Sequence, residues 1–320
     1  MFRSTMGRFA VIAFILLSYA FFALPSMPLQ NFTKFPYTPY HLLTEGFLAG
    51  HLSFTEEPLP ELLKLKDPYD PAQNARYRLH DASLYHGKYY LYFGPLPVLT
   101  VLLPIKLATG YYAPETLAIF LFASVGFIFS FLLLMKVKDT FFNEMSEWQL
   151  YFAGLLLGLA NNSAYLFSSP RFYENAGASS FCFMSIALYF LLRIFTDKNT
   201  WQNTAWFSTF LTLSAAGRPN FMLAWAAIPL VAYYLVKKGE RKSLFALFIP
   251  AICAGLALGW YNYLRFGSFI EFGRKYQVTS ESYFQGAKLI SPDFIFKIPE
   301  QFYFSSSLMS LMLPIPYHIG

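Results

Sequence analysis

The sequence predicts an all-α polytopic membrane protein with about seven to nine transmembrane or juxtamembrane helices and a long outer loop after the first of them. Charged residues make up only 13% of the 320 residues, whereas hydrophobic residues make up 56%. A soluble globular protein carries about 25% charged residues. Several apolar runs also approach the ~20 residues that a helix needs to cross a bilayer. These observations argue against a soluble domain and indicate a chain embedded in a membrane.

Apolar runs recur along the whole chain, and we expect each to be helical because backbone polar groups in lipid must be paired internally. The runs cover residues 9–25, 94–109, 114–135, 149–167, 176–195, 203–216, 220–236, 243–263 and 302–316. A basic start makes the first run resemble a signal peptide, which stays an alternative. We expect an uncleaved helix, since the run is long enough to span and no small-residue cleavage site follows it.

Lys and Arg in the short loops predict the topology. If the N-terminus lies in the cytoplasm, the basic loops 136–138, 193–198 and 237–242 share its side only when 94–109 does not cross. That run is short, contains three prolines and carries Lys106, so we expect a juxtamembrane or re-entrant helix at the outer surface. The other runs up to 263 then cross as seven helices. In the alternative, 94–109 crosses and the charge bias is lost.

The net charge and the placement of the cysteines limit the kinds of partner and bound metal that we expect. A net charge of +6 fits cytoplasmic loops that meet lipid phosphate, and we expect no nucleic-acid partner. The two cysteines both lie in apolar runs, which argues against a disulfide framework or a zinc site. The chain ends at "PIPYHIG" without a polar tail. We expect it either to be truncated there or to end in a membrane segment.

Polar side chains gather in the segments that this topology places outside. Ionisable groups at membrane depth are costly and usually functional, so we treat them as the candidate site. They are Glu45 in "YHLLTEGFLAGHLSF", His80, Asp81 and Lys88 in "RLHDASLYHGKYYLYFGPLP", Arg171, Tyr173 and Glu174 in "SPRFYENA", Arg218 in "GRPN" and Arg265 in "NYLRFGSFIEFGRKYQ". Arginine forks suit phosphate oxygens, and a carboxylate can take the proton of an acceptor hydroxyl. The set predicts transfer of a sugar from a lipid-phosphate donor.

The order of these segments resembles the polytopic GT-C glycosyltransferases, specifically the family that groups protein O-mannosyltransferases, aminoarabinose transferases and related bacterial sugar transferases. The shared order is a first helix, a long outer loop with an acidic residue, a proline-rich juxtamembrane helix and an Arg-x-x-acid corner. The resemblance implies that residues 1–320 form one GT-C-like transmembrane domain, with outer loops at 26–93 and 264–301. It also implies a multi-pass enzyme of the bacterial cytoplasmic membrane that builds the cell envelope.

Such enzymes use polyprenyl-phosphate sugars at the outer face, and the acceptor is a lipid, a glycan or a protein. Their catalytic acid follows the first helix, which implies Glu45 here, with Asp81 as the second candidate. The usual acid is an Asp, often beside another acid, whereas Glu45 stands alone in "LLTEGFL". This departure leaves the base and any use of a divalent metal open. No metal ligands are predicted.

The remaining roles follow the same interpretation. We expect donor-phosphate binding by Arg171 and Arg218, helped by Lys88 or His80, and substrate positioning by the following residues: Tyr173, Glu174 and Arg265. For the whole chain, two alternatives stay open. One is a transporter or flippase of a lipid-linked or anionic solute, and the other is a non-catalytic scaffold of an envelope assembly complex.

Simpler interpretations of single residues also stay open. Glu45 could be a solvated residue on an interfacial helix, and Asp81 could be the N-cap of a helix that starts at "DASLY". Arg171 and Arg218 could extend to lipid head groups without specificity. His80 fits a surface position better than a metal site, because its neighbours do not form a zinc-binding spacing.

Overall fold

The computed structural model describes residues 2–27, 32–161, 163–168 and 170–280. Contacts separate a unit ending at Thr279 from residues 280–320. The predicted run 302–316 and most of the predicted outer loop 264–301 lie outside the described residues.

Within the described residues, five helices are long and apolar enough to cross a membrane. Four are continuous: α1 (Phe2–Ala23), α6 (Glu115–Phe141), α9 (Phe172–Thr196) and α12 (Arg241–Phe266). The fifth joins the 3₁₀ helix η4 (Pro219–Ala226) to α11 (Ala227–Lys237). The described chain is therefore mostly helical and compatible with the predicted all-α membrane class, whereas the prediction of seven crossing helices is not confirmed.

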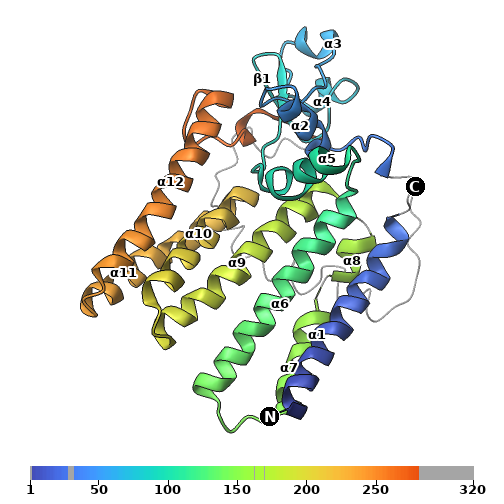
Figure 1. Ribbon diagram of the computed structural model, residues 1–320. Coiled ribbons are helices and arrows are strands. Elements are labelled where there is room, and N and C mark those ends of the chain that lie inside the picture. Colours follow the sequence, from blue (N-terminus) through green and yellow to red (C-terminus); the bar gives the residue numbers. More distant parts are fainter. Residues whose placement is uncertain (1, 28–31, 162, 169, 281–320) are drawn as a thin grey trace. The chain divides into compact units, whose positions relative to one another are not determined.

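The two remaining predicted spans differ from the five. The run 149–167 divides into α7 (Glu147–Leu159) and α8 (Ser163–Ser168), and neither reaches the ~20 residues of a span. The run 203–216 forms α10 (Thr200–Gly217), whose buried face is rich in Ser, Thr and Asn. This helix packs between α9 and α12 (Figure 1), and its Ser208 hydroxyl donates to the carbonyl of Leu247 at 2.5 Å.

The proline-rich run 94–109 forms a short helix, as predicted. A π-helical turn, η3 (Val98–Leu102), continues into α5 (Leu103–Thr109), which ends at Gly110 with φ 76°. Twelve residues reach only ~18 Å, which is less than the ~30 Å of a bilayer core. A second short helix, α2 (Pro39–Leu48), packs against η3, and two single turns, α3 (Pro60–Leu63) and α4 (Pro71–Asn74), follow it in sequence.

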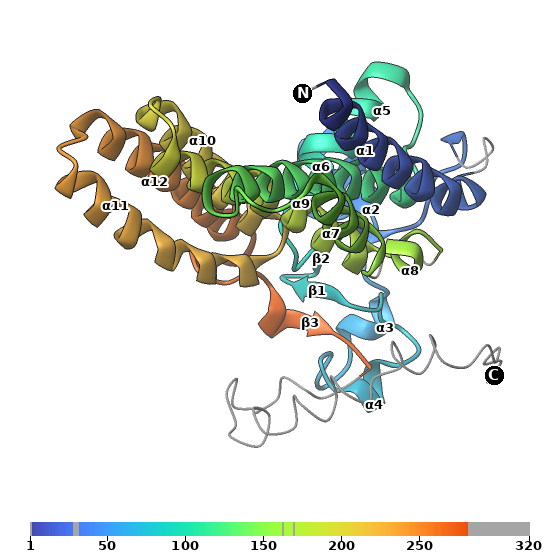
Figure 2. The same cartoon turned by 90° about the horizontal axis from the view of Figure 1, so that it is seen from below.

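A small antiparallel sheet is the element that the sequence did not predict. Strands β1 (Ala82–Tyr85), β2 (Lys88–Tyr90) and β3 (Gln277–Val278) pair in the order β2-β1-β3, so the two predicted outer loops meet. The hairpin turns at His86 and Gly87, both with positive φ. Asp81 precedes β1 with φ 61°, so its interpretation as a helix N-cap is wrong. Figure 2 shows the strands beside α3 and α4, outside the layer of α6, α9 and α10.

Ion pairs join the helix ends that carry the basic loops. Glu147 at the start of α7 binds Arg8 of α1 at 2.8 Å and Lys138 of α6 at 3.2 Å. Asp197 after α9 binds Lys136 at 2.7 Å and Arg193 at 2.6 Å. The helices α2 to α5 and the sheet gather at the opposite end of the bundle (Figure 1). The basic loops and the first long loop therefore lie at opposite ends, as the charge bias predicts.

Replacing Glu147 by Gln is expected to lower the free energy of unfolding by about 1 kcal/mol at pH 7, because a partly exposed bidentate ion pair is lost. The hydrogen bond from Arg8, together with Lys138 and against the effect of burial, lowers the pKa of Glu147 from 4.5 to about 2. A lowered pKa stabilises the fold above the unfolded-state value, and this stabilisation is lost as pH falls through the folded-state value. Thermal unfolding in detergent should show the difference between wild type and Glu147→Gln shrinking from pH 4.5 downward.

The matched control is Glu144→Gln, since Glu144 is exposed on the neighbouring loop. A destabilisation by Glu147→Gln that stays constant down to pH 2, or that Glu144→Gln reproduces, would contradict this role for the ion pair.

Candidate functional site

A cavity of about 600 Å³ lies among α1, α6, α7, α8, α9 and the end of α10. Most of its wall is apolar, and its charged groups come from α9 and the end of α10. The lining residues are Tyr19, Ala123, Leu157, Asn161, Tyr165, Leu166, Tyr173, Glu174, Gly177, Ala178, Phe181 and Arg218. The structure therefore brings three of the predicted site residues, Tyr173, Glu174 and Arg218, into one cavity.

Arg218 owes its place to the proline that follows it. A residue before proline is disfavoured in the helical region, and Arg218 ends α10 with extended φ −138° and ψ 115°. Its guanidinium lies over the ring of Phe93, 5.4 Å from the centroid. In the described part of the chain it makes no ion pair and no side-chain hydrogen bond. Among the described residues, the Arg218 guanidinium therefore has donors without a partner at the wall of a largely apolar cavity.

Tyr173 and Glu174 lie in the first turn of α9. An acidic residue there is favoured by the partial positive charge of a helix N-terminus. The Tyr173 ring contacts Phe93 edge-on, with centroids 6.0 Å apart. Glu174 Oε2 is buried and has no hydrogen-bond partner among the described residues. The start of α9 therefore supplies an aromatic face and a carboxylate to the same cavity.

The main chain of residues 89–94 joins this cavity to the sheet. The amide of Gly94 donates to the carbonyl of Gly217 at 3.2 Å, and a side chain at Gly94 would collide with the carbonyl of Ala216. The carbonyl of Leu91 accepts from Arg265 Nη1 at 2.5 Å. The segment is thus bonded to the ends of both α10 and α12.

Arg265, predicted to position substrate, is only 2% exposed. Its second terminal nitrogen donates to Asn262 Oδ1 at 2.7 Å, and its guanidinium lies 3.8 Å from the ring centroid of Tyr261. Any positioning by Arg265 therefore acts through the main chain at Leu91, and its predicted role stays a prediction.

Asp81 immediately precedes β1, which pairs with β2 at the start of this segment. Its amide donates to the carbonyl of Val278, and its Oδ1 accepts from Gln277 Nε2 at 2.9 Å. Burial raises the pKa of the Tyr92 hydroxyl, Asp81 raises it further, and Arg218 lowers it. Asp81 and Arg218 therefore act electrostatically on the same tyrosine.

Glu45 has a different environment. It lies half-buried on α2 and accepts a hydrogen bond from the Tyr112 hydroxyl at 3.0 Å. The ammonium of Lys106 lies over that same ring, 3.5 Å from its centroid. Glu45 is not among the described residues that line the cavity.

A buried carboxylate that the sequence analysis missed lies between α2, α6 and α9. Glu115 at the start of α6 is 6% exposed and accepts hydrogen bonds from Thr38 Oγ1 at 2.8 Å and from Asn175 Nδ2. His41 Nδ1 lies 3.8 Å from the same carboxylate. The sequence feature that could have identified Glu115 is that it is the one acidic residue at the start of the apolar run 114–135, directly after Pro114.

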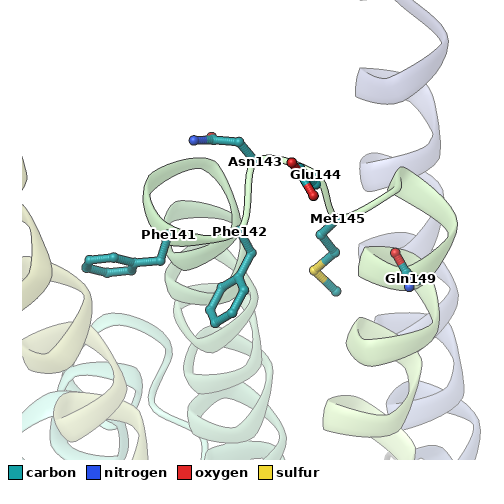
Figure 3. A pocket seen from close by; sticks show the side chains of 6 residues that line it. All are labelled: Phe141, Phe142, Asn143, Glu144, Met145 and Gln149. Carbon is teal, nitrogen blue, oxygen red and sulfur yellow. The ribbon is translucent and has the colours of Figure 1, made fainter.

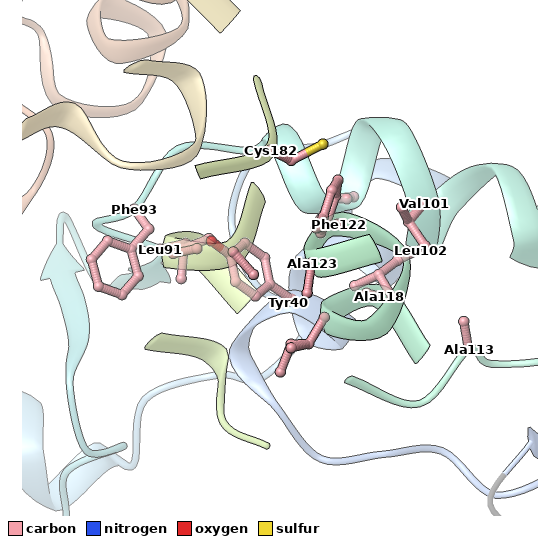
Figure 4. Close-up of a cluster of buried hydrophobic side chains, with 14 of the residues drawn as sticks. Tyr40, Leu91, Phe93, Val101, Leu102, Ala113, Ala118, Phe122, Ala123 and Cys182 are labelled. Atoms are coloured by element: carbon pink, nitrogen blue, oxygen red, sulfur yellow. The ribbon is translucent and has the colours of Figure 1, made fainter. Parts of the chain in front are cut away.

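Tyr40 is fully buried and is influenced by the charges of both this carboxylate and Arg218. Figure 4 shows its ring among buried side chains that include Leu91, Phe93 and Ala123. Its hydroxyl is buried and unpartnered within the described chain. Burial and Glu115 raise the pKa of that hydroxyl, whereas Arg218 lowers it.

The other predicted residues lie on exposed surface. Arg171 precedes α9 as its N-cap, Lys88 begins β2, and the His80 side chain is 55% exposed, with Nε2 3.5 Å from Asp81 Oδ2. The cavity wall, as far as it is described, includes none of the three. The described residues also contain no group of three His, Cys, Asp or Glu side chains that could hold a metal ion.

A second hollow, of about 660 Å³, opens at the loop between α6 and α7, at the end of the bundle that carries the basic loops (Figure 3). It is lined by Phe141, Phe142, Asn143, Glu144, Met145 and Gln149. None of the predicted site residues lies there.

In comparisons with known proteins, no family model, no curated protein and no solved structure matches this chain. The resemblance to GT-C glycosyltransferases thus rests on the sequence motifs alone. The function has to be argued from the geometry of the cavity.

Replacing Glu115 by Ala is expected to lower the free energy of unfolding by about 3 kcal/mol, because the buried donors of Thr38 and Asn175 lose their acceptor. Glu115→Gln keeps one acceptor oxygen and should lose less than half as much. Thermal unfolding of the purified protein measures both variants, with the exposed Glu144→Ala as control. Equal effects of Glu115→Ala and Glu144→Ala would contradict the anchoring role of Glu115.

Proposed function

We propose that this chain is a membrane glycosyltransferase that moves a sugar from a polyprenyl-phosphate donor to an acceptor at the outer face of the bacterial cytoplasmic membrane. The observation that carries the proposal is Arg218, a cation without a described counter-ion at the wall of a mostly apolar cavity. An anion attached to a long hydrocarbon chain fits both properties of that cavity.

The surroundings of Arg218 support a sugar beside the phosphate. Tyr173 lines the cavity and contacts the ring of Phe93, over which the guanidinium lies, so it offers an aromatic ring near the cation. Asp81 lies close enough to influence the same tyrosine hydroxyl as Arg218 does. We favour Asp81 over Glu45 as the base because Asp81 acts on the same tyrosine as Arg218, whereas Glu45 is bound to Tyr112. Neither carboxylate is among the described residues of the cavity wall.

The proposed reaction proceeds with inversion. Asp81 accepts the proton of the acceptor hydroxyl as the acceptor oxygen bonds to the anomeric carbon. The bond from that carbon to the phosphate oxygen breaks, and the electron pair leaves with polyprenyl phosphate. Arg218 stabilises the charge that develops on the leaving phosphate, and the exposed Arg171, Lys88 and His80 would attract the anionic donor.

The test uses purified protein in lipid with radiolabelled polyprenyl-phosphate sugars and a membrane extract as the source of acceptor. Asp81→Asn is expected to lower the transfer rate by about a hundredfold or more, because a general base is removed. Arg218→Gln should weaken donor binding as well as transfer. Glu45→Gln should retain most of the activity.

Matched controls are Glu57→Gln and Arg241→Gln, since both side chains are exposed and away from the cavity wall. The proposal fails if a broad donor panel is neither bound nor consumed by wild type. Full activity in Asp81→Asn together with loss in Glu45→Gln would instead make Glu45 the base.

A further inference from the structure

Glu174 and Arg218 face one cavity from two different helices. Residues three apart on a helix lie on the same face, so Glu174 stands one turn from Gly177 on α9. A Cβ at Gly177 would lie 3.6 Å from Arg218 Nη1, which places the guanidinium against that face. Both charged side chains also line the cavity wall. The carboxylate and the guanidinium are therefore neighbours across the same space.

These two opposite charges are nevertheless not joined. In the described part of the chain, neither side chain forms an ion pair within 4.0 Å. Glu174 Oε2 is buried and unpartnered within that part as well. A buried charged oxygen is strongly unfavourable unless a hydrogen-bond donor meets it. A bound molecule that carries both an anion and a nearby donor would satisfy the two side chains together.

We propose that Glu174 is a specificity-determining residue which accepts a hydrogen bond from a hydroxyl or ammonium group of the lipid head group while Arg218 binds its phosphate. The inference rests on the proposed function for the phosphate at Arg218 and adds the requirement for a donor group beside it. A polyprenyl phosphate without a sugar satisfies Arg218 alone. A phosphate-linked sugar with free hydroxyl or amino groups satisfies both residues.

Three probes separate the two contacts: polyprenyl phosphate, its glucosyl derivative and its O-methylated glucosyl derivative. Methylation removes the hydrogen-bond donors of the sugar and keeps the phosphate and the hydrocarbon chain. The measurement is equilibrium binding of each lipid to the purified protein in detergent. Wild type is expected to bind the glucosyl lipid about tenfold more tightly than the methylated one, as one charge-assisted hydrogen bond allows.

Glu174→Gln is expected to abolish most of this preference and to leave binding of polyprenyl phosphate unchanged. Glu174→Asp draws the carboxylate back by one methylene and should also lower the preference for the glucosyl lipid. It replaces Glu174→Gln in the test if that variant does not fold. Arg218→Gln should weaken binding of all three lipids by a similar factor. Glu144→Gln is the control and should leave all three affinities unchanged.

Two failures can be told apart. If wild type and Glu174→Gln discriminate equally between the glucosyl and methylated lipids, the role of Glu174 is wrong and the phosphate site stands. If none of the three lipids binds, or if Arg218→Gln binds them as wild type does, the phosphate site of the proposed function fails, and the inference fails with it.

Discussion

The attachment of the main chain at residues 89–94 to two helix ends is the constraint on which the site depends. Arg265 holds the carbonyl of Leu91 from α12, and the carbonyl of Gly217 at the end of α10 holds the amide of Gly94. Phe93 lies between these bonds, and its ring supports Arg218. A shift of this segment would therefore move the aromatic face, the cation and Tyr92 together. These bonds hold the segment beside Arg218, which lines the cavity.

Buried charged groups stabilise this arrangement only because the surrounding polar atoms satisfy them. Arg265 is bound by main-chain carbonyls and by Asn262, and Glu115 by Thr38 and Asn175. Removing one partner of such a group leaves an uncompensated charge or an unpaired donor, which is more costly than the gain from the original contact. Arg218 and Glu174 differ from them, since both lack such partners in the described chain. This contrast separates charges that hold the fold from charges suited to a ligand.

The apolar runs predicted most helices correctly, because length and hydropathy are local properties of the sequence. They overestimated α7 and α10, since α7 stops before a span is complete and α10 buries Ser, Thr and Asn against its neighbours. The pairing of β1 with β3 was missed because the two strands lie almost two hundred residues apart, and no local pattern encodes that pairing. The hairpin of β1 and β2 is local, and its turn at His86 and Gly87 was a signal that the sequence did contain. Charge and position identified Tyr173, Glu174 and Arg218 as site candidates, but Glu115 looked like the start of an ordinary apolar helix. The role of Glu115 as a buried hydrogen-bond acceptor depends on Thr38 and Asn175, which are distant in the sequence and become neighbours only in the fold.

Hydrogen–deuterium exchange of the Arg265→Met variant tests the attachment of residues 89–94 most directly. The amides of 91–94 and of 217–221 should exchange at least tenfold faster together, because loss of the bond to Leu91 frees the segment that also binds the end of α10. The amides of α7 and of the first turns of α1, at the opposite end, should keep their wild-type rates, and Arg241→Met should change none of them. Unchanged exchange at 217–221, or a uniform increase along the whole chain, would contradict the claim that this segment couples the two helix ends.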